Sequence, residues 1–310
     1  MSIWPDIPYQ RFQPTAQALH MWLQIVGKFK LANTPWVNHS WHATFYVHHR
    51  GLSTGLVHCQ GQSYEVLFDC VDHQLVIHGN AGKHATCPLG SMSVAEFHTM
   101  FLEMLGEVDA PTRFHGSPNE VPDPVPFVRQ TTPLPYDKDA VHDFWRALSV
   151  MEPVFQTFRI AFLGKVSPMH LFWGSFDLAC TRFSGRTAPP HPGGFPALPD
   201  DITREAYSHE VISAGFWPGG GPLDAPAFYA YAYPSPEGLA DAPVLPDAAY
   251  YDPDFGEFIL PYDAVRNADD PQATLLAFLQ STYDGAADLL NWDRAALECA
   301  IGQKGWVRAL

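Results

Sequence analysis

The segment between Val108 and Asp137 constrains the fold more than any other stretch of the chain. It contains seven prolines, which are Pro111, Pro118, Pro122, Pro124, Pro126, Pro133 and Pro135. Because proline fixes φ and removes a backbone N–H donor, this segment is incompatible with a long helix or a central strand. We therefore predict an extended connector over residues 111–137, which joins a first half of residues 1–110 to a second half of residues 138–310.

The first half is predicted to contain a helix, an antiparallel sheet and a second helix. Apolar residues at helical spacing predict a helix over about residues 14–30, with Pro14 in its first turn. Residues 41–89 alternate short β-rich runs with glycine and aspartate turns, which is typical of an antiparallel meander. Ser93 and Glu96 then form the sequence pattern of a capping box, which predicts the start of the second helix.

The second half follows the same order. A helix is predicted over about residues 139–163, and Pro153 is expected to kink or split it. Five β-rich runs follow, and their sequences are HLFWGSF, DLACTRF, SHEVISAGF, AFYAYAY and GEFILPY. Asp270 and Pro271 suit the cap and the first position of a final helix.

We therefore predict an α+β fold in which two helix–antiparallel sheet–helix halves pack around a common core. A short similarity between residues 27–41 and 164–173 suggests an internal duplication, with a chance similarity as the alternative.

Charge and composition exclude several classes of partner. The chain carries 33 Asp and Glu against 18 Lys and Arg, a net charge of −15. Such a surface repels nucleic acids and anionic lipids, so we expect neither as a partner. The chain has no apolar run of about 18 residues and begins without a signal-peptide pattern, so we expect a cytoplasmic protein without membrane spans. Its five cysteines form no CxxC pair, which argues against a disulfide framework or a thiolate zinc site. The oligomeric state is left open.

Four sequence blocks carry a resemblance to a known family. They are LHMWLQIVGKFKL, HLFWGSFDLACTRFSGR, SHEVISAGFWPGG and LQSTYDGAADLLNWDR. Together they resemble an uncharacterised bacterial family described only as a domain of unknown function, and the HLFWGSFDLACTRFSGR block is specific to it. The resemblance spans nearly the whole chain. It implies a bacterial protein, and it supplies no activity, cofactor or site residue.

His170 and Asp177 are the candidate catalytic residues. If the chain turns near Gly174, the two side chains face each other across a hairpin, where Asp177 orients a histidine that acts as a general base. The structural alternative is that Asp177 only orients His170 or pairs with Arg182.

A divalent transition metal is the candidate cofactor. His170, His191, His209 and Glu210 are ligand types found in zinc and non-haem iron sites. The chain lacks the spacings HExxH, HxH and HxD, and 15 histidines make chance groupings common, which is the alternative interpretation.

A stripe of polar residues on the first helix is a candidate ligand surface. His20, Gln24 and Lys28 lie four residues apart and suit an anionic or amide-bearing ligand, with an ordinary solvated face as the alternative. Trp173, Arg182 and Trp217 are further candidates, the tryptophans as walls of a binding site.

These candidates lead to two hypotheses about function. The first is that the protein binds a small molecule in a cleft between the two halves, either as a binding protein or as an enzyme with a His/Asp/Glu site. The competing hypothesis is a non-catalytic protein-interaction module that uses an aromatic surface and the proline-rich connector. A deep pocket with convergent polar groups would favour the first, and a flat apolar patch the second.

Overall fold

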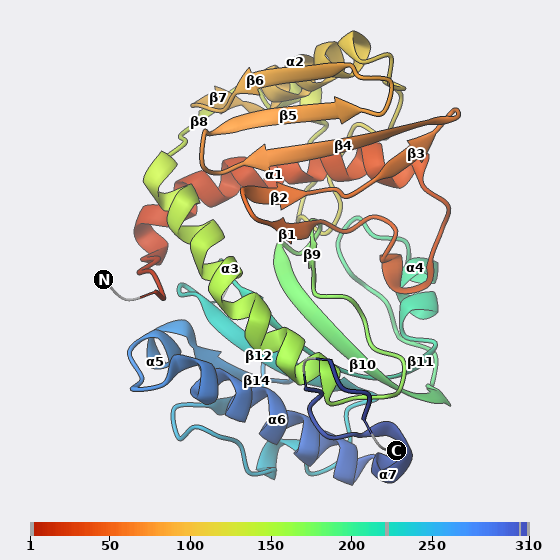
Figure 1. Cartoon of the computed structure of the whole chain (residues 1–310), viewed down its shortest axis with the longest axis vertical. Coiled ribbons are helices and arrows are strands. Elements are labelled where there is room, and N and C mark those ends of the chain that lie inside the picture. Colours follow the sequence, from red (N-terminus) through yellow and green to blue (C-terminus); the bar gives the residue numbers. More distant parts are fainter. Residues whose placement is uncertain (1–2, 221–222, 304, 309–310) are drawn as a thin grey trace.

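Two six-stranded antiparallel sheets form the frame of the molecule in the computed structural model, which describes residues 3–220, 223–303 and 305–308 (Figure 1). The first sheet has the order β1-β2-β4-β5-β6, with β3 also paired to β4. Its strands are β1 (Tyr46–His48), β2 (Gly51–Ser53), β3 (Val57–Cys59), β4 (Gln62–Asp69), β5 (Gln74–Gly79) and β6 (His84–Pro88). These strands lie within the stretch predicted to be an antiparallel meander.

The second sheet has the order β13-β14-β12-β11-β10-β9. Its strands are β9 (His170–Phe172), β10 (Asp177–Thr187), β11 (His209–Trp217), β12 (Ala227–Tyr233), β13 (Tyr250–Asp252) and β14 (Glu257–Pro261). Five of them fall on the five predicted β-rich runs, and β13 was not predicted. A two-stranded sheet pairs β7 (Met92–Ser93) with β8 (Pro133–Leu134).

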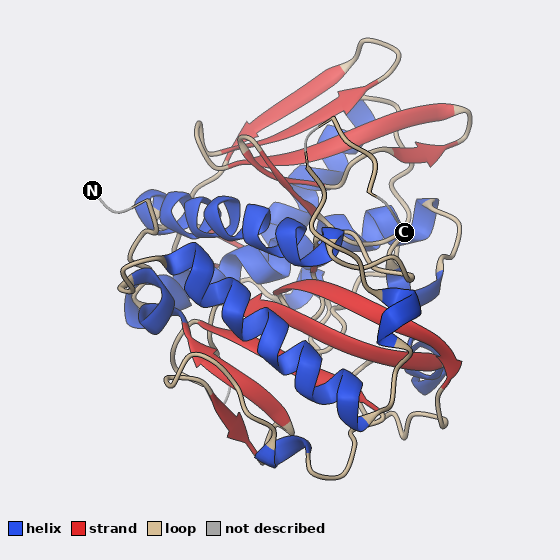
Figure 2. Cartoon of the chain, turned by 60° about the horizontal axis from the view of Figure 1, so that its bottom comes forward, coloured by secondary structure: helices blue, strands red, loops and turns tan. Residues whose placement is uncertain are grey.

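The helices surround and connect these sheets. They are α1 (Tyr9–Asn33), α2 (Val94–Glu107), α3 (Lys138–Ile160), α4 (Asp200–Ala206), α5 (Tyr262–Arg266), α6 (Pro271–Leu289) and α7 (Arg294–Leu297), with the 3-10 helices η1 (Asn38–Ser40), η2 (Phe127–Arg129) and η3 (Leu239–Asp241). Helix α1 crosses the molecule beside the first sheet, and α3 runs from it towards the second sheet, where α6 lies (Figures 1 and 2). Within the described ranges, no helix is long and apolar enough to cross a membrane.

The predicted helix caps are present. The Ser93 hydroxyl accepts a hydrogen bond from the Glu96 amide, while the Glu96 carboxylate accepts one from the Ser93 amide at 2.7 Å. Asp270 caps α6 by accepting a hydrogen bond from the Ala273 amide at 3.0 Å. Each cap satisfies backbone donors that the first helical turn cannot pair internally.

The predicted start of the first helix was wrong, and Pro153 does not split the helix that contains it. Helix α1 begins at Tyr9, well before the predicted start, so Pro14 lies inside the helix. The buried Phe12 stacks on Phe144 of α3 at 4.8 Å, and this tertiary contact extends the helix. Helix α3 likewise runs through Pro153 without being split, because its apolar face is buried on both sides of the proline.

The two halves share one core. The buried apolar residues form a single cluster that draws on helices and strands from both halves. The sheets also meet at their edges, where the backbones of Phe45 and Leu171 exchange hydrogen bonds of 2.9 and 2.8 Å. The α+β fold is therefore confirmed. The internal duplication is not confirmed, since the strand orders of the two sheets differ.

Candidate functional site

A pocket of about 720 Å³ lies on one face of the second sheet. Successive residues of a strand point to opposite faces of a sheet. On β12, Phe228 contacts Phe155 of α3, so the even-numbered residues face the helices. Tyr229 and Tyr231 point the other way and form part of the pocket floor, together with Asp177 of β10 and Glu257 of β14.

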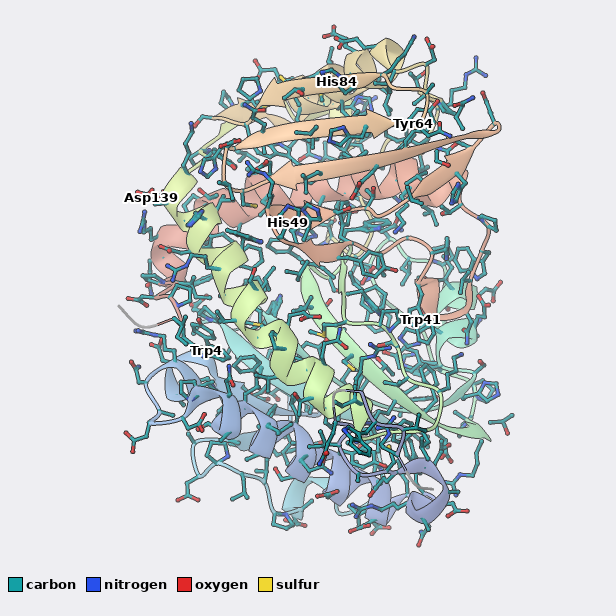
Figure 3. All side chains as sticks on the ribbon, in the orientation of Figure 1. Trp4, Trp41, His49, Tyr64, His84 and Asp139 are labelled. Carbon is teal, nitrogen blue, oxygen red and sulfur yellow. The ribbon has the colours of Figure 1, made fainter. Side chains whose placement is uncertain are left out.

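The walls of the pocket come from segments far apart in the sequence. His39 belongs to η1, Thr203 to α4, and His191 to the loop that precedes α4. Glu120 comes from the proline-rich connector. Both η1 and α4 lie on the side of the second sheet away from α3, near Trp41 (Figures 1 and 3).

Asp177 is a buried carboxyl group at the pocket floor, with only 8% of its surface exposed. It accepts hydrogen bonds from the hydroxyls of Ser175 and Tyr229. Burial raises the pKa of Asp177, and these two hydrogen bonds oppose that rise by stabilising the carboxylate. The same burial and the charge of Asp177 raise the pKa of Tyr229 well above its ordinary value, so the phenol stays neutral.

Two further carboxyl groups share the pocket. Burial, and secondarily repulsion by Asp177, raises the pKa of both Glu120 and Glu257 to about 7. Neither glutamate nor Asp177 takes part in an ion pair among the described residues. The described lining also contains no lysine or arginine. Lys28 of α1, which lies outside the lining, attracts Glu120 and lowers its pKa in part. The pocket therefore holds three poorly solvated carboxyl groups, and no lysine or arginine of the described lining offsets their charge.

Aromatic side chains cover much of the remaining surface. The rings of Tyr229 and Tyr231 stack with their centroids 6.1 Å apart and an angle of 19° between their planes. Tyr231 and Tyr207 share a hydrogen bond of 2.7 Å between their hydroxyls. His191 packs on Tyr207 at 4.7 Å and on Tyr233 at 4.8 Å. These rings give the pocket apolar faces with a few hydroxyl groups.

Gln24 of α1 does not line the pocket, but it holds the segment that does. Its side-chain amide donates to the Asn119 carbonyl at 2.7 Å and accepts from the Asn119 amide at 3.0 Å. The next residue, Glu120, donates its backbone N–H to the Pro196 carbonyl at 2.9 Å. Asn119 also donates from its side chain to the Ala197 carbonyl. These contacts anchor Glu120 between α1 and the loop before α4.

His20 and Lys28 complete this contact. Lys28 donates to the side-chain oxygen of Asn119, and His20 donates to the Gly174 carbonyl at 2.8 Å. The carboxyl group of Glu120 lies directly against Gly174, where a Cβ atom would overlap it. The stripe of His20, Gln24 and Lys28 therefore neither lines the pocket nor forms an ordinary solvated face. It holds the connector and the β9–β10 turn.

The structure places His170 away from the pocket lining. The predicted β9–β10 hairpin forms, with His170 opposite Ala179 and Asp177 opposite Phe172. No part of His170 is exposed, and neither of its ring nitrogens has a hydrogen-bond partner among the described residues. Burial lowers its pKa to about 3, so the ring is neutral. Asp177 therefore does not orient His170.

Trp173 and Arg182 are also outside the pocket lining. Trp173 donates to the Ala43 carbonyl at 2.8 Å and packs closely on Gly27 of α1. Arg182 is 1% exposed on the helix-facing side of the sheet, and its guanidinium carbon lies 3.5 Å from the centre of the Phe158 ring. Of the predicted aromatic walls, only Trp217 lines the pocket.

The predicted metal ligands are not brought together. Glu210 binds Arg186 at 2.7 Å, while the neighbouring His209 contacts Ser208 at 3.1 Å. Since adjacent residues of a strand point to opposite faces, His209 and Glu210 are poorly placed to share an ion. Across residues 3–220, 223–303 and 305–308, no group of three or more His, Cys, Asp or Glu side chains is arranged to hold a metal ion.

The sequence analysis missed most of the pocket. The alternation in AFYAYAY is a signal for Tyr229, Tyr231 and Tyr233, because it separates tyrosines from alanines on a strand. Glu257 and Ile259 are two residues apart on β14, so they share a face of the strand, and both line the pocket. Glu120 has no local signal, since only long-range contacts bring this part of the connector to the second sheet.

The comparisons with known proteins agree with the resemblance seen in the sequence. The family described as "Family of unknown function (DUF5996)" matches residues 4–299, and the chain belongs to this family. Neither the curated proteins nor the solved structures contain a match to this chain.

Proposed function

We propose that this member of a family of unknown function binds a small organic cation, an amine, in the pocket on the second sheet. The observation that carries the proposal is the convergence of Glu120, Asp177 and Glu257 in a tyrosine-lined pocket whose described lining contains no lysine or arginine. Buried carboxylates are unfavourable unless they are paired, and a bound ammonium group supplies the missing partner.

The tyrosine rings support the same class of ligand. An ammonium group is attracted to the face of an aromatic ring, and alkyl carbons pack on it. Tyr229, Tyr231 and Tyr207 present such rings next to the carboxyl groups. An anionic ligand is disfavoured in this environment because it would be repelled by three carboxyl groups.

The concave shape of the site supports a small ligand over a protein partner. A protein-interaction module was expected to present a flat apolar patch, whereas a pocket of about 720 Å³ with convergent polar groups is typical of small-molecule sites. The walls include His39 and Glu120 from the first half and the connector, in keeping with the predicted site between the halves.

Binding of a cation is expected to release protons. Near pH 7 the two glutamates, each with a pKa of about 7, are partly protonated. An ammonium group lowers the pKa of a neighbouring carboxyl group, so protons leave as the ligand binds. The affinity for an amine should therefore rise from about pH 5.5 to about pH 8, where the carboxyl groups ionise and the amine keeps its charge.

Isothermal titration calorimetry with matched ligands tests the proposal. Butylamine, putrescine and spermidine are compared with 1,4-butanediol and succinate, which are neutral and anionic molecules of similar size. We expect the amines to bind and the diol and succinate to bind at least about 10-fold more weakly. A pH electrode in weakly buffered solution measures the released protons. Equal binding of the diol, or no binding of any amine, would contradict the proposal.

A further inference from the structure

The acidic groups of the pocket lie at two separate places. Glu120 and Asp177 are both at the β9–β10 turn, since Glu120 lies against Gly174 and Asp177 begins β10. Glu257 begins β14, next to the β13–β14 turn, and Asp254 of that turn also lines the pocket. We call these the β10 pole and the β14 pole.

The sheet order sets the separation between the poles. Strands β11 and β12 lie between β10 and β14, so three strand spacings of about 4.8 Å place the two strands roughly 14 Å apart across the sheet. The register pairs Leu178 with Phe216, Phe216 with Phe228 and Phe228 with Leu260, so Glu257 also lies about four positions along the sheet from Asp177. A single ammonium group is too small to contact acidic groups from both strands. A longer molecule with a cation at each end fits this arrangement.

The floor between the poles is aromatic. Tyr229 reaches the β10 pole through its hydrogen bond to Asp177, and the Tyr231 ring stacks beside it. Tyr231 also contacts Tyr207 of the opposite wall. Rings of this kind suit a chain of methylene groups, which gains apolar contact without needing a hydrogen-bond partner.

We propose that the pocket takes a linear polyamine, with one ammonium group between Glu120 and Asp177 and another at Glu257, and with its methylene chain along Tyr229 and Tyr231. This inference rests on the proposed function and makes it specific, because it requires two cationic groups in one ligand and assigns each pole a separate role.

A ligand series and two neutral variants test the inference. The ligands are the diamines from 1,3-diaminopropane to 1,10-diaminodecane, spermidine, and the n-alkylamines of matching length. The variants are Glu120→Gln and Glu257→Gln, with Glu237→Gln as a control because Glu237 is an exposed acid outside the pocket lining. Calorimetry gives the affinities, and thermal unfolding of each variant verifies that it is folded.

We expect the best diamine to bind about 10-fold or more tightly than its monoamine, because it makes a second charge-assisted contact. Each pocket variant should lower the diamine affinity by about 10-fold or more, and Glu237→Gln should leave it unchanged. For a monoamine, one pocket variant should weaken binding and the other should not.

Four results would overturn the inference. Equal affinity for monoamines and diamines, or diamine binding that is unaffected by Glu257→Gln, would indicate a single ammonium site and leave the proposed function standing. Diamine binding that survives in the double variant Glu120→Gln/Glu257→Gln would indicate attraction to the acidic surface as a whole. Absence of binding for every amine would overturn the proposed function as well.

Discussion

Glu120 and Glu257 are poorly solvated as carboxylates, and this gives the stability of the free protein a defined pH dependence. The ordinary glutamate pKa is 4.5, and both residues have a pKa of about 7 in the folded chain. At pH values between 4.5 and 7, these glutamates are largely ionised in the unfolded state and still largely protonated in the folded state. Their contribution to the free energy of unfolding is therefore fully present below about pH 4.5 and is lost as the pH rises through 7.

Neutral substitutions should reveal this dependence. Glu120→Gln and Glu257→Gln should each raise the melting temperature by about 2–6 °C at pH ~8, where the native carboxylates are charged, and change it little at pH ~5. Circular dichroism melts of the three proteins in the absence of amines measure the shift. The same change at both pH values would show that the substitutions act by packing and not through the charge.

His170 gives a second prediction, because it is buried and neutral and its ring nitrogens lack partners among the described residues. Its pKa falls from 6.5 to about 3 on folding, so it destabilises the fold as the pH drops below about 6.5. His170→Leu should reduce this loss and leave amine affinity within about 2-fold of the wild type. Urea unfolding at several pH values and calorimetry measure the two effects. If the folded variant lost most of its amine binding, His170 would have to contribute to the binding site.

At the scale of elements, α1 acts on the pocket through the connector. Gln24 pairs with both backbone groups of Asn119, and Glu120 follows in the chain. Truncating Gln24 removes two hydrogen bonds that hold this segment in place. Gln24 thus positions the carboxyl group of Glu120 through the backbone of Asn119, without a hydrogen bond of its own to that group.

Gln24→Ala should therefore lower spermidine affinity by about 3- to 10-fold, since Glu120 is no longer held against Gly174. The variant should also release fewer protons when spermidine binds. If the substitution only lowered the stability of the fold, the molecules that remain folded would release as many protons as the wild type. Gln17→Ala is the matched control, because Gln17 is an exposed glutamine of the same helix. Equal effects of the two variants would contradict a positioning role for Gln24.

At the scale of the whole molecule, one apolar cluster joins both halves. Trp22 of α1 packs with Phe97 of α2 at 4.9 Å, and Phe12 of the same helix packs with Phe144 of α3 at 4.8 Å. Helix α1 thus belongs to the packing of both halves. The backbone bridge between Phe45 and Leu171 adds a direct link between the sheets.

We expect such a core to unfold cooperatively. Differential scanning calorimetry should show one transition whose calorimetric and van't Hoff enthalpies agree, and a bound polyamine should move that transition to a higher temperature. Two separate transitions, of which only one responds to the ligand, would mean that the halves unfold as independent units.

Local sequence patterns were sufficient to predict most helices and strands, but they did not predict which residues line the pocket. Periodicity located the helices and most strands, and capping chemistry located the starts of α2 and α6, because these depend on neighbouring residues. The predicted start of α1 was wrong, since the burial of Phe12 against α3 decides it.

The candidate site depends on contacts between distant segments. His170 and Asp177 lie on one predicted hairpin and, since His170 pairs with Ala179, on the same face of the sheet. Only Asp177 lines the pocket, because His170 is buried with the rings of Trp41 and Phe172 packed against it.

The sequence by itself determined an acidic α+β chain with two antiparallel sheets, since charge and hydrophobic periodicity are properties of local sequence. Only the tertiary structure decided that Glu120 of the connector joins Asp177 and Glu257 of the second sheet in one pocket. The position of Glu120 depends on the hydrogen bonds between Gln24 and Asn119, which are 95 residues apart in the sequence. A local sequence pattern cannot predict a contact over such a separation. The charge of the pocket, and with it the proposed ligand, follows from this long-range contact.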